Sequence, residues 1–219
     1  MPSGRRERNK EEKLTRIADA ASRLFDELGF ASVTTQRIAD EADVAAGTVF
    51  RYASTKAELL MMVDNERSRS RIAAGLAADD PALPAAQRLL AIVTPLIAAG
   101  RDNDENTLAY QRELLFGEQH ERYRAEGLAL FADLRERMAD VLADAWLRRG
   151  APAPAPDPAA AARALSAALH LAIADAATRG TPTRDLLADL AADFEVIVRG
   201  YETTQTTSHT DTIEGHEET

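Results

Sequence analysis

Apolar residues return every three or four positions along most of this chain, and no segment alternates convincingly between apolar and polar residues. The first spacing places apolar side chains on one face of a helix, whereas alternation would place them on one face of a strand. Composition favours the same outcome, because Ala fills about a fifth of the 219 positions and aromatic residues only 5%. The sequence therefore predicts an all-α fold without a sheet.

The pattern divides the chain into helices separated by short breaks. A first amphipathic helix carries apolar residues from Leu14 to Leu28 and ends at Gly29, a common stop for a helix. The other expected helices are two short ones over 34–43, capped by Thr34, and 46–52, one capped by Ser54 or Thr55, one from Pro81 or Pro84 to Gly100 that Pro95 should bend, and four over 102–117, 119–149, 159–178 and 184–202. Residues 151–158 are typical of an extended polyproline-like connector, and the Thr-rich residues 203–219 of a disordered tail.

Charge is distributed unevenly. The net charge of −10 argues against a protein that coats nucleic acid through its overall charge. Residues 1–56 nevertheless carry ten Lys and Arg against nine Asp and Glu, whereas residues 57–219 carry 16 against 27. Six of the basic residues lie within 1–16, and Arg51 and Lys56 lie in an acid-free stretch. This distribution indicates a local polyanion-binding head, and the alternative is a solvated arm beside a chance gap in the acids.

Several protein classes do not fit. We find no 18-residue apolar run that would span a membrane, and the first residues, MPSGRRERNKEEK, lack the apolar core of a signal peptide, so we expect a cytoplasmic protein. The chain contains no Cys, which removes disulfides, thiolate metal sites and Cys nucleophiles.

Two short helices joined by a tight turn are the outline of a helix-turn-helix. Ala39 is small where the two helices must approach closely, Asp43 stands in the turn, and Val49 packs the second helix against the first. The turn position requires a positive φ, which Asp tolerates better than most residues. The alternative is that these are ordinary Ala-rich helices of a bundle.

A longer string points to one family. Residues 30–59, FASVTTQRIADEADVAAGTVFRYASTKAEL, closely resemble the DNA-binding signature of the tetracycline-repressor (TetR) family of transcription regulators, and the resemblance extends over residues 10–60. The matching positions are Thr34-Thr35, Ile38-Ala39, Ala42, Val44, Gly47-Thr48, Phe50, Tyr52, Lys56 and Glu58-Leu59. There are two departures: Asp43 replaces the usual Gly, and Ala53 replaces the usual Phe, which loosens a contact between the head and the following helix.

The resemblance implies that the second short helix enters the major groove of DNA. By position, it implies phosphate contacts for Thr35, Tyr52 and Lys56, and contacts to backbone or base edges for Gln36 and Arg37. The residues expected to face the groove are Ala45, Ala46, Gly47, Thr48, Phe50 and Arg51. Only Arg51 among them can pair bidentately with guanine, so we expect it to read sequence, the alternative being that it only neutralises phosphate.

The resemblance also implies a homodimer, because one head reads too few bases for useful specificity. Two apolar stripes near the carboxyl end fit a four-helix interface between copies. The expected interface residues are Leu165, Leu169, Ile173, Leu187, Leu190, Phe194 and Ile197. The alternative is that these stripes complete the core of the chain itself.

The middle helices carry polar and aromatic groups at apolar spacings, namely Thr94, Tyr110, Glu113, Phe116, Trp146 and His170. Together they would line an apolar cavity for a small effector, whose binding, as the resemblance implies, moves residues 55–72 and misaligns the two heads. Each also fits a plainer role, such as a core histidine at 170 or a helix-capping Trp146.

The sequence thus predicts a DNA-binding domain over 1–54 with a basic arm, a helical regulatory and dimerisation domain over 55–202, and a disordered tail over 203–219. The predicted function is a repressor that binds a palindromic DNA operator as a homodimer and is released by a small apolar effector. The alternative is a helical enzyme or scaffold without DNA binding. We expect no enzyme activity, cofactor or metal, because neither His120 nor His170 has the Glu three residues before it that helical metal-carboxylate sites use.

Overall fold

The computed structural model describes residues 4–99, 103–118, 121–150 and 155–204, which form nine α-helices and no strand. The helices are α1 (Gly4–Ser32), α2 (Thr35–Glu41), α3 (Ala46–Val49), α4 (Lys56–Ala77), α5 (Ala85–Ala99), α6 (Asp104–Phe116), α7 (Arg122–Arg148), α8 (Pro158–Arg179) and α9 (Thr183–Thr203). The all-α prediction is confirmed. The predicted tail from residue 205 onward and the first half of the proline-rich connector, 151–154, lie outside the described residues.

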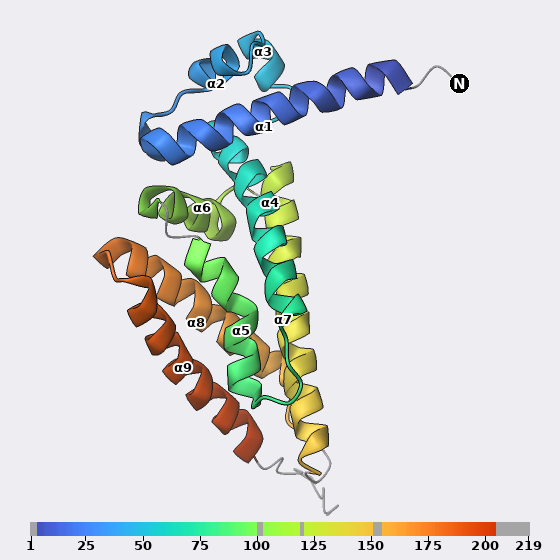
Figure 1. Cartoon of the computed structure of the whole chain (residues 1–219), viewed down its shortest axis with the longest axis vertical. Helices are drawn as coiled ribbons and strands as arrows, with labels where there is room; N and C mark the ends of the chain where they lie inside the picture. Colours follow the sequence, from blue (N-terminus) through green and yellow to red (C-terminus); the bar gives the residue numbers. More distant parts are fainter. Residues whose placement is uncertain (1–3, 100–102, 119–120, 151–154, 205–219) are drawn as a thin grey trace, which may run out of the picture.

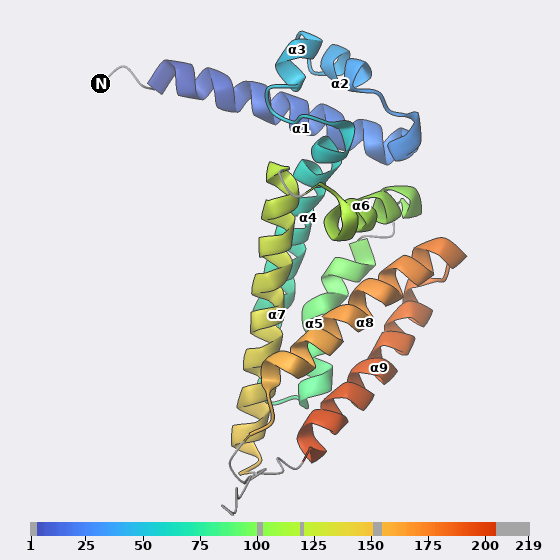
Figure 2. The ribbon, with the colours of Figure 1, turned by 180° about the vertical axis from the view of Figure 1, so that it is seen from behind.

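The helices form a small head and a larger body (Figure 1). The head consists of α1 with α2 and α3 on one side of it, and the body, α4–α9, lies on the opposite side of α1 (Figures 1 and 2). α4 runs from the head down the length of the body beside α7, and α8 and α9 pack together at the far side of α5. α1 contacts the body through α4 and α6.

The apolar stripe of α1 forms the core of the head. Ile17, Ala21 and Phe25 are fully buried and pack with Ile38 of α2 and Val49 of α3. Helical backbone breaks at the predicted stop, Gly29, where φ is +75°, and one further turn continues to Ser32. An added Cβ at Gly29 would overlap the Glu105 carboxylate, so this position combines a positive φ with a close approach of α6.

Two buried polar side chains fix α4 against its neighbours. The Asn65 amide Nδ2 donates to the Tyr123 carbonyl at 2.7 Å, and its Oδ1 accepts from the Tyr110 hydroxyl at 2.8 Å. In the first turn of α4, Glu58 accepts hydrogen bonds from the backbone N–H groups of Ser54 and Tyr123. These bonds tie α4 to the start of α7 and to α6, and Asn65, Tyr110 and Tyr123 are all buried.

α8 differs from the sequence expectation in one respect. Among the described residues it alone is long and apolar enough, by length and composition, to reach the threshold of a membrane span, with a mean hydropathy of 1.2. The sequence predicts that no segment reaches this threshold, and the Ala-rich composition of α8 is the reason that it does. Core helices of globular proteins pass the same test, and α8 packs against α6, α7 and α9.

Gly75 of α4 provides a test of helix packing. An added Cβ there would overlap the backbone carbonyl of Ile92 on α5, whereas a Cβ at Gly200 of α9 meets nothing within 4 Å. We expect Gly75→Ala to lower the free energy of unfolding by about 1–3 kcal/mol through overpacking. The matched control Gly200→Ala should raise it by up to about 1 kcal/mol through helix propensity. Chemical denaturation measures both, and equal effects would contradict the close α4–α5 approach.

Candidate nucleic-acid interface and effector cavity

The second and third helices of the head form a helix-turn-helix. Thr34 caps α2 by accepting a hydrogen bond from the Arg37 N–H at 3.2 Å, as predicted. The chain then turns at Asp43, whose φ is +52°, and the Val44 N–H donates to the Ala39 carbonyl at 3.0 Å. Val49 of α3 is fully buried against this unit. The spacing predicted for the turn therefore matches the geometry, with Asp43 in the left-handed conformation that glycine usually takes.

α3 is short, and most of its side chains are exposed or half-buried. The regular helix covers only residues 46–49, and turns continue it to Tyr52. Apart from Val49, the side chains of this segment are exposed or half-buried, including Phe50, a large apolar group that is 51% exposed. The predicted groove-facing residues are placed as follows: Ala45, Gly47, Phe50 and Arg51 are exposed, and Ala46 and Thr48 are half-buried.

The residues predicted to contact the DNA backbone surround α3. Gln36 and Arg37 are exposed at the start of α2, beside half-buried Thr35, and the Gln36 amide donates to Asp40 at 2.7 Å. Tyr52 is half-buried, and its hydroxyl donates to the Lys10 carbonyl of α1 at 3.1 Å.

Among the residues predicted to contact the DNA backbone, Lys56 makes the most contacts inside the protein. Its Nζ donates to the Phe30 carbonyl at 2.8 Å and lies 4.3 Å from the centre of the Phe30 ring. An ammonium has three N–H donors, so a phosphate contact would use one that the end of α1 leaves available. Lys56 thus joins the first turn of α4 to the last turn of α1.

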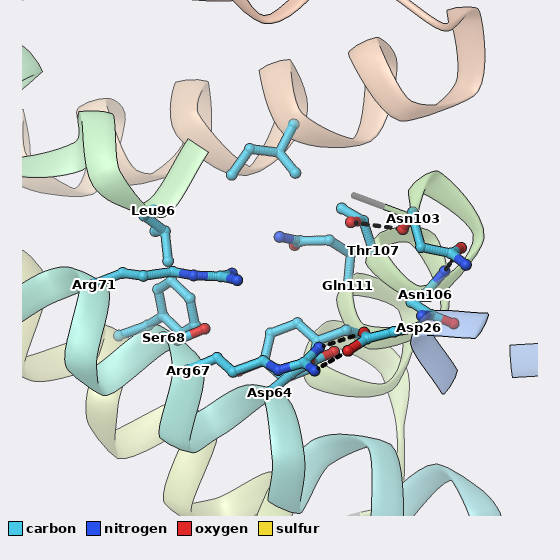
Figure 3. Close-up of a pocket in the computed structure, with 13 residues that line it drawn as sticks. Asp26, Asp64, Arg67, Ser68, Arg71, Leu96, Asn103, Asn106, Thr107 and Gln111 are labelled. Carbon is cyan, nitrogen blue, oxygen red and sulfur yellow. Dashed lines mark hydrogen bonds and ion pairs between the residues drawn. The ribbon is translucent and has the colours of Figure 1, made fainter. Parts of the chain in front are cut away.

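A cavity of about 70 Å³ lies where the head meets the body (Figure 3). Its walls come from α1, α4, α5, α6, α7 and α8. The lining residues are Asp26, Asp64, Arg67, Ser68, Arg71, Leu96, Asn103, Asn106, Thr107, Tyr110, Gln111, Phe131 and Ile173. Figure 3 shows Arg71 of α4 and Gln111 of α6 extending into the same space.

Arg67 joins the cavity to the head. Its guanidinium binds both carboxylate oxygens of Asp26 on α1, at 2.5 and 2.9 Å, and reaches Asp64 at 3.3 Å. The Ser22 hydroxyl of α1 accepts a further bond from it. Burial raises the pKa of Asp64 to about 6, although the nearby guanidinium groups of Arg67 and Arg71 act in the opposite direction.

α6 also holds the end of α1. The Asn106 side chain donates to the Phe25 carbonyl at 2.8 Å, and the Glu105 carboxylate accepts a bond from the Ala31 N–H. Asn106 lines the cavity as well, so one side chain borders the cavity and binds the head.

The six predicted effector residues do not gather around this cavity. Tyr110 lines it, and His170 lies next to it, with Nδ1 2.9 Å from the Gln111 amide oxygen and its ring against Phe131. Burial lowers the pKa of His170, which favours the neutral ring. The other four are placed elsewhere: Thr94 bonds its own helix at Leu90, Glu113 pairs with Arg112, Phe116 is 82% exposed, and Trp146 packs on Tyr201.

The sequence reading missed the charged wall contributed by α4. Asp64, Arg67 and Arg71 follow at spacings of three and four, together with Ser68, and such spacings place them on one face of the helix. This polar stripe beside the apolar one was the available signal.

The predicted dimer residues divide into two groups. Four of them are at most 1% exposed within the single chain, namely Leu165, Leu169, Leu190 and Phe194. These four fit the alternative reading, in which the stripes complete the core of the chain itself. Ile173, Leu187 and Ile197 are half-buried. The large apolar side chains that α8 and α9 expose are Leu171 and Val196, each 71% exposed, and both line a surface groove between the two helices.

An exposed recognition segment on a helix-turn-helix head, joined to a helical body with a cavity, defines a DNA-binding transcription regulator. Residues 17–62 match the family described as bacterial regulatory proteins, tetR family. The matched segment covers most of the head, from Ile17 of α1 through α2 and α3, and the first two turns of α4. No curated protein sequence matches it.

Solved structures share the fold. A TetR transcriptional regulator from Rhodococcus sp. RHA1 has a TM-score of 0.65 at 16% identity, over 88% of this chain and 98% of that one. FadR from Bacillus subtilis, in complex with stearoyl-CoA, has a TM-score of 0.65 at 18% identity, over 85% and 98%. FadR from Thermus thermophilus, a TetR family repressor in complex with lauroyl-CoA, has a TM-score of 0.60 at 22% identity, over 89% and 97%.

Proposed function

We propose that this regulator is a cytoplasmic repressor that binds a palindromic operator as a homodimer and releases it when a small molecule fills the cavity. The observation that carries the proposal is the Arg67 contact, because one side chain lines the cavity and binds α1 of the head. A ligand that alters this contact changes the position of the head relative to the body. Such a ligand releases DNA if it binds the misaligned arrangement more tightly than the aligned one.

The effector we propose has both an apolar and a polar part. Leu96, Phe131 and Ile173 supply an apolar wall, and the remaining wall consists mainly of amide, hydroxyl and charged groups. This wall is more polar than the apolar cavity that the sequence predicts. Ligand sites usually enclose roughly 300–1,000 Å³, so a ligand must widen the cavity and displace α6 or α8 from α4. The acyl-CoA complexes of the two FadR structures support the idea that this fold can open in that way.

Arg51 should read bases. It is exposed on α3, and among the described residues it has no ion-pair partner. We expect Arg51→Ala to weaken operator binding and to flatten the preference at one guanine position per half-site, at about 1–3 kcal/mol for that base pair. Gel shifts with a base-substituted operator set measure this. Equal weakening on every sequence, with a smaller salt dependence, would show that Arg51 only binds phosphate.

Homodimerisation should use the exposed side of α8 and α9. Leu171→Glu combined with Val196→Glu places charge in the groove between these helices and should give a monomer by sedimentation velocity. The control is Leu147→Glu on α7, because Leu147 is equally exposed, at 77%, and lies outside the groove. A dimer that survives the double substitution would place the interface elsewhere.

Effector action should depend on Arg67. A thermal-shift screen that includes stearoyl-CoA and lauroyl-CoA identifies compounds that stabilise the protein, and fluorescence anisotropy then measures release of operator DNA. We expect a true effector to weaken operator binding about 5–150-fold. In Arg67→Met the effect of the same compound on DNA affinity, measured at a concentration that saturates this variant, should largely disappear.

The matched control is Arg69→Met, because Arg69 is exposed on the same helix and its one ion pair within the described part of the chain is with Glu66. If Arg67→Met and Arg69→Met respond to the effector like the unmodified protein, the contact with Asp26 does not carry the signal. If no compound both stabilises the protein and frees DNA, the effector proposal fails.

A further inference from the structure

The apolar face of α1 becomes cationic where the helix extends beyond the head. Ile17 is fully buried and Leu14 half-buried on the side of α1 that packs in the head. Residues four apart share a face of a helix. Lys13, four residues before Ile17, and Lys10, four residues before Leu14, therefore lie on this same face. Figures 1 and 2 show this part of α1 running past α3, with no other helix covering it.

Lys10 and Lys13 border the recognition segment. A surface hollow is lined by Glu7, Asn9, Lys10 and Lys13 of α1 together with Thr48, Arg51 and Tyr52. The Tyr52 hydroxyl, which donates to the Lys10 carbonyl at 3.1 Å, holds the two elements together at this place. The two helical segments therefore present their side chains to the same space.

Three cations around this hollow are left without acidic partners. In the part of the chain that the structure describes, neither lysine nor Arg51 forms an ion pair, whereas Arg16 and Arg23, further along α1, pair with Asp43 and Glu41. Glu7 is the one acid on the wall of the hollow. An exposed site with three unpaired cations and one carboxylate attracts an anion.

We propose that Lys10 and Lys13 bind backbone phosphates of the operator strand that flanks the groove entered by α3. This inference rests on the proposed function, because it takes the same DNA as its ligand. Lysine suits the role, since its ammonium is a compact charge that binds phosphate without a fixed geometry. The arm from Gly4 to Lys13 rises about 14 Å along its axis, which corresponds to about four phosphates of one strand.

The two lysines therefore supply affinity but no base discrimination. Contacts to phosphate fix the register of a protein on DNA and carry no sequence information of their own. The hollow lies beside α3, so its phosphates belong to the edge of the half-site that α3 reads. The Glu7 carboxylate opposes this contact, and its removal should strengthen it.

The test compares two double variants that lose the same charge from the same helix. Lys10→Ala with Lys13→Ala removes the two lysines of the hollow, and Arg8→Ala with Arg16→Ala removes two cations of α1 that do not line it. The operator is first selected from random DNA with the unmodified full-length protein. Each variant is then titrated against the operator and a scrambled duplex at a series of potassium chloride concentrations.

We expect the Lys10/Lys13 variant to reduce the slope of log K against log salt by about 1.8 per head, because each phosphate contact contributes about 0.9. Its preference for operator over scrambled DNA should stay unchanged, and hydroxyl-radical protection should shrink at the flank. The Arg8/Arg16 variant should reduce the slope by much less. Glu7→Gln should bind both duplexes more tightly.

Two outcomes would overturn the inference and can be told apart. If the unmodified protein binds DNA and the two double variants have equal slopes, the lysines bind no phosphate and the proposed function stands. If the unmodified protein selects no operator, the proposed function fails and this inference fails with it. Circular dichroism checks that each variant keeps its helix content, which Ala substitutions in an exposed helix should preserve.

Discussion

The position of α4 depends on polar groups buried along it. Asn65 satisfies both ends of its amide with Tyr123 and Tyr110, and Glu58 accepts two backbone N–H groups, so each bond exists only at one depth and one rotation of the helix. An apolar stripe alone would tolerate small rotations, whereas a buried amide that loses its partner carries a desolvation cost. The relation between head and body follows from this fixed helix.

α4 is joined to its neighbours both by close helix packing and by polar contacts. Gly75 brings α4 into close contact with α5 in the body. Where the head meets the body, hydrogen bonds and ion pairs of Arg67, Asn106, Glu105 and Lys56 add to the shared apolar core. Polar contacts of this kind depend on direction and exchange readily with ligand or water. In the function we propose, these polar contacts carry a change in the cavity to the residues on the other side of α1.

Local patterns in the sequence predicted the helices and the recognition segment, because capping at Thr34, the stop at Gly29 and the turn at Asp43 depend on neighbouring residues. The cavity could not be predicted so directly. Thr94 and Phe116 have suitable chemistry, but their direction depends on how α5 and α6 rotate in the bundle. Apolar periodicity also cannot distinguish a core from an interface, which is why Leu165 and Phe194 were expected between copies and lie inside one chain.

The continuity of α1 has a mechanical consequence. From Phe25, where α6 holds it, to Gly4 the helix is about 31 Å long and unbroken, so it behaves as a lever with its fulcrum at the α6 contact. A tilt of about 5° at that fulcrum displaces the free end by about 3 Å, which is the length of a hydrogen bond. A motion too small to disturb the packing of the body is therefore amplified to the scale on which contacts with a duplex are made or lost.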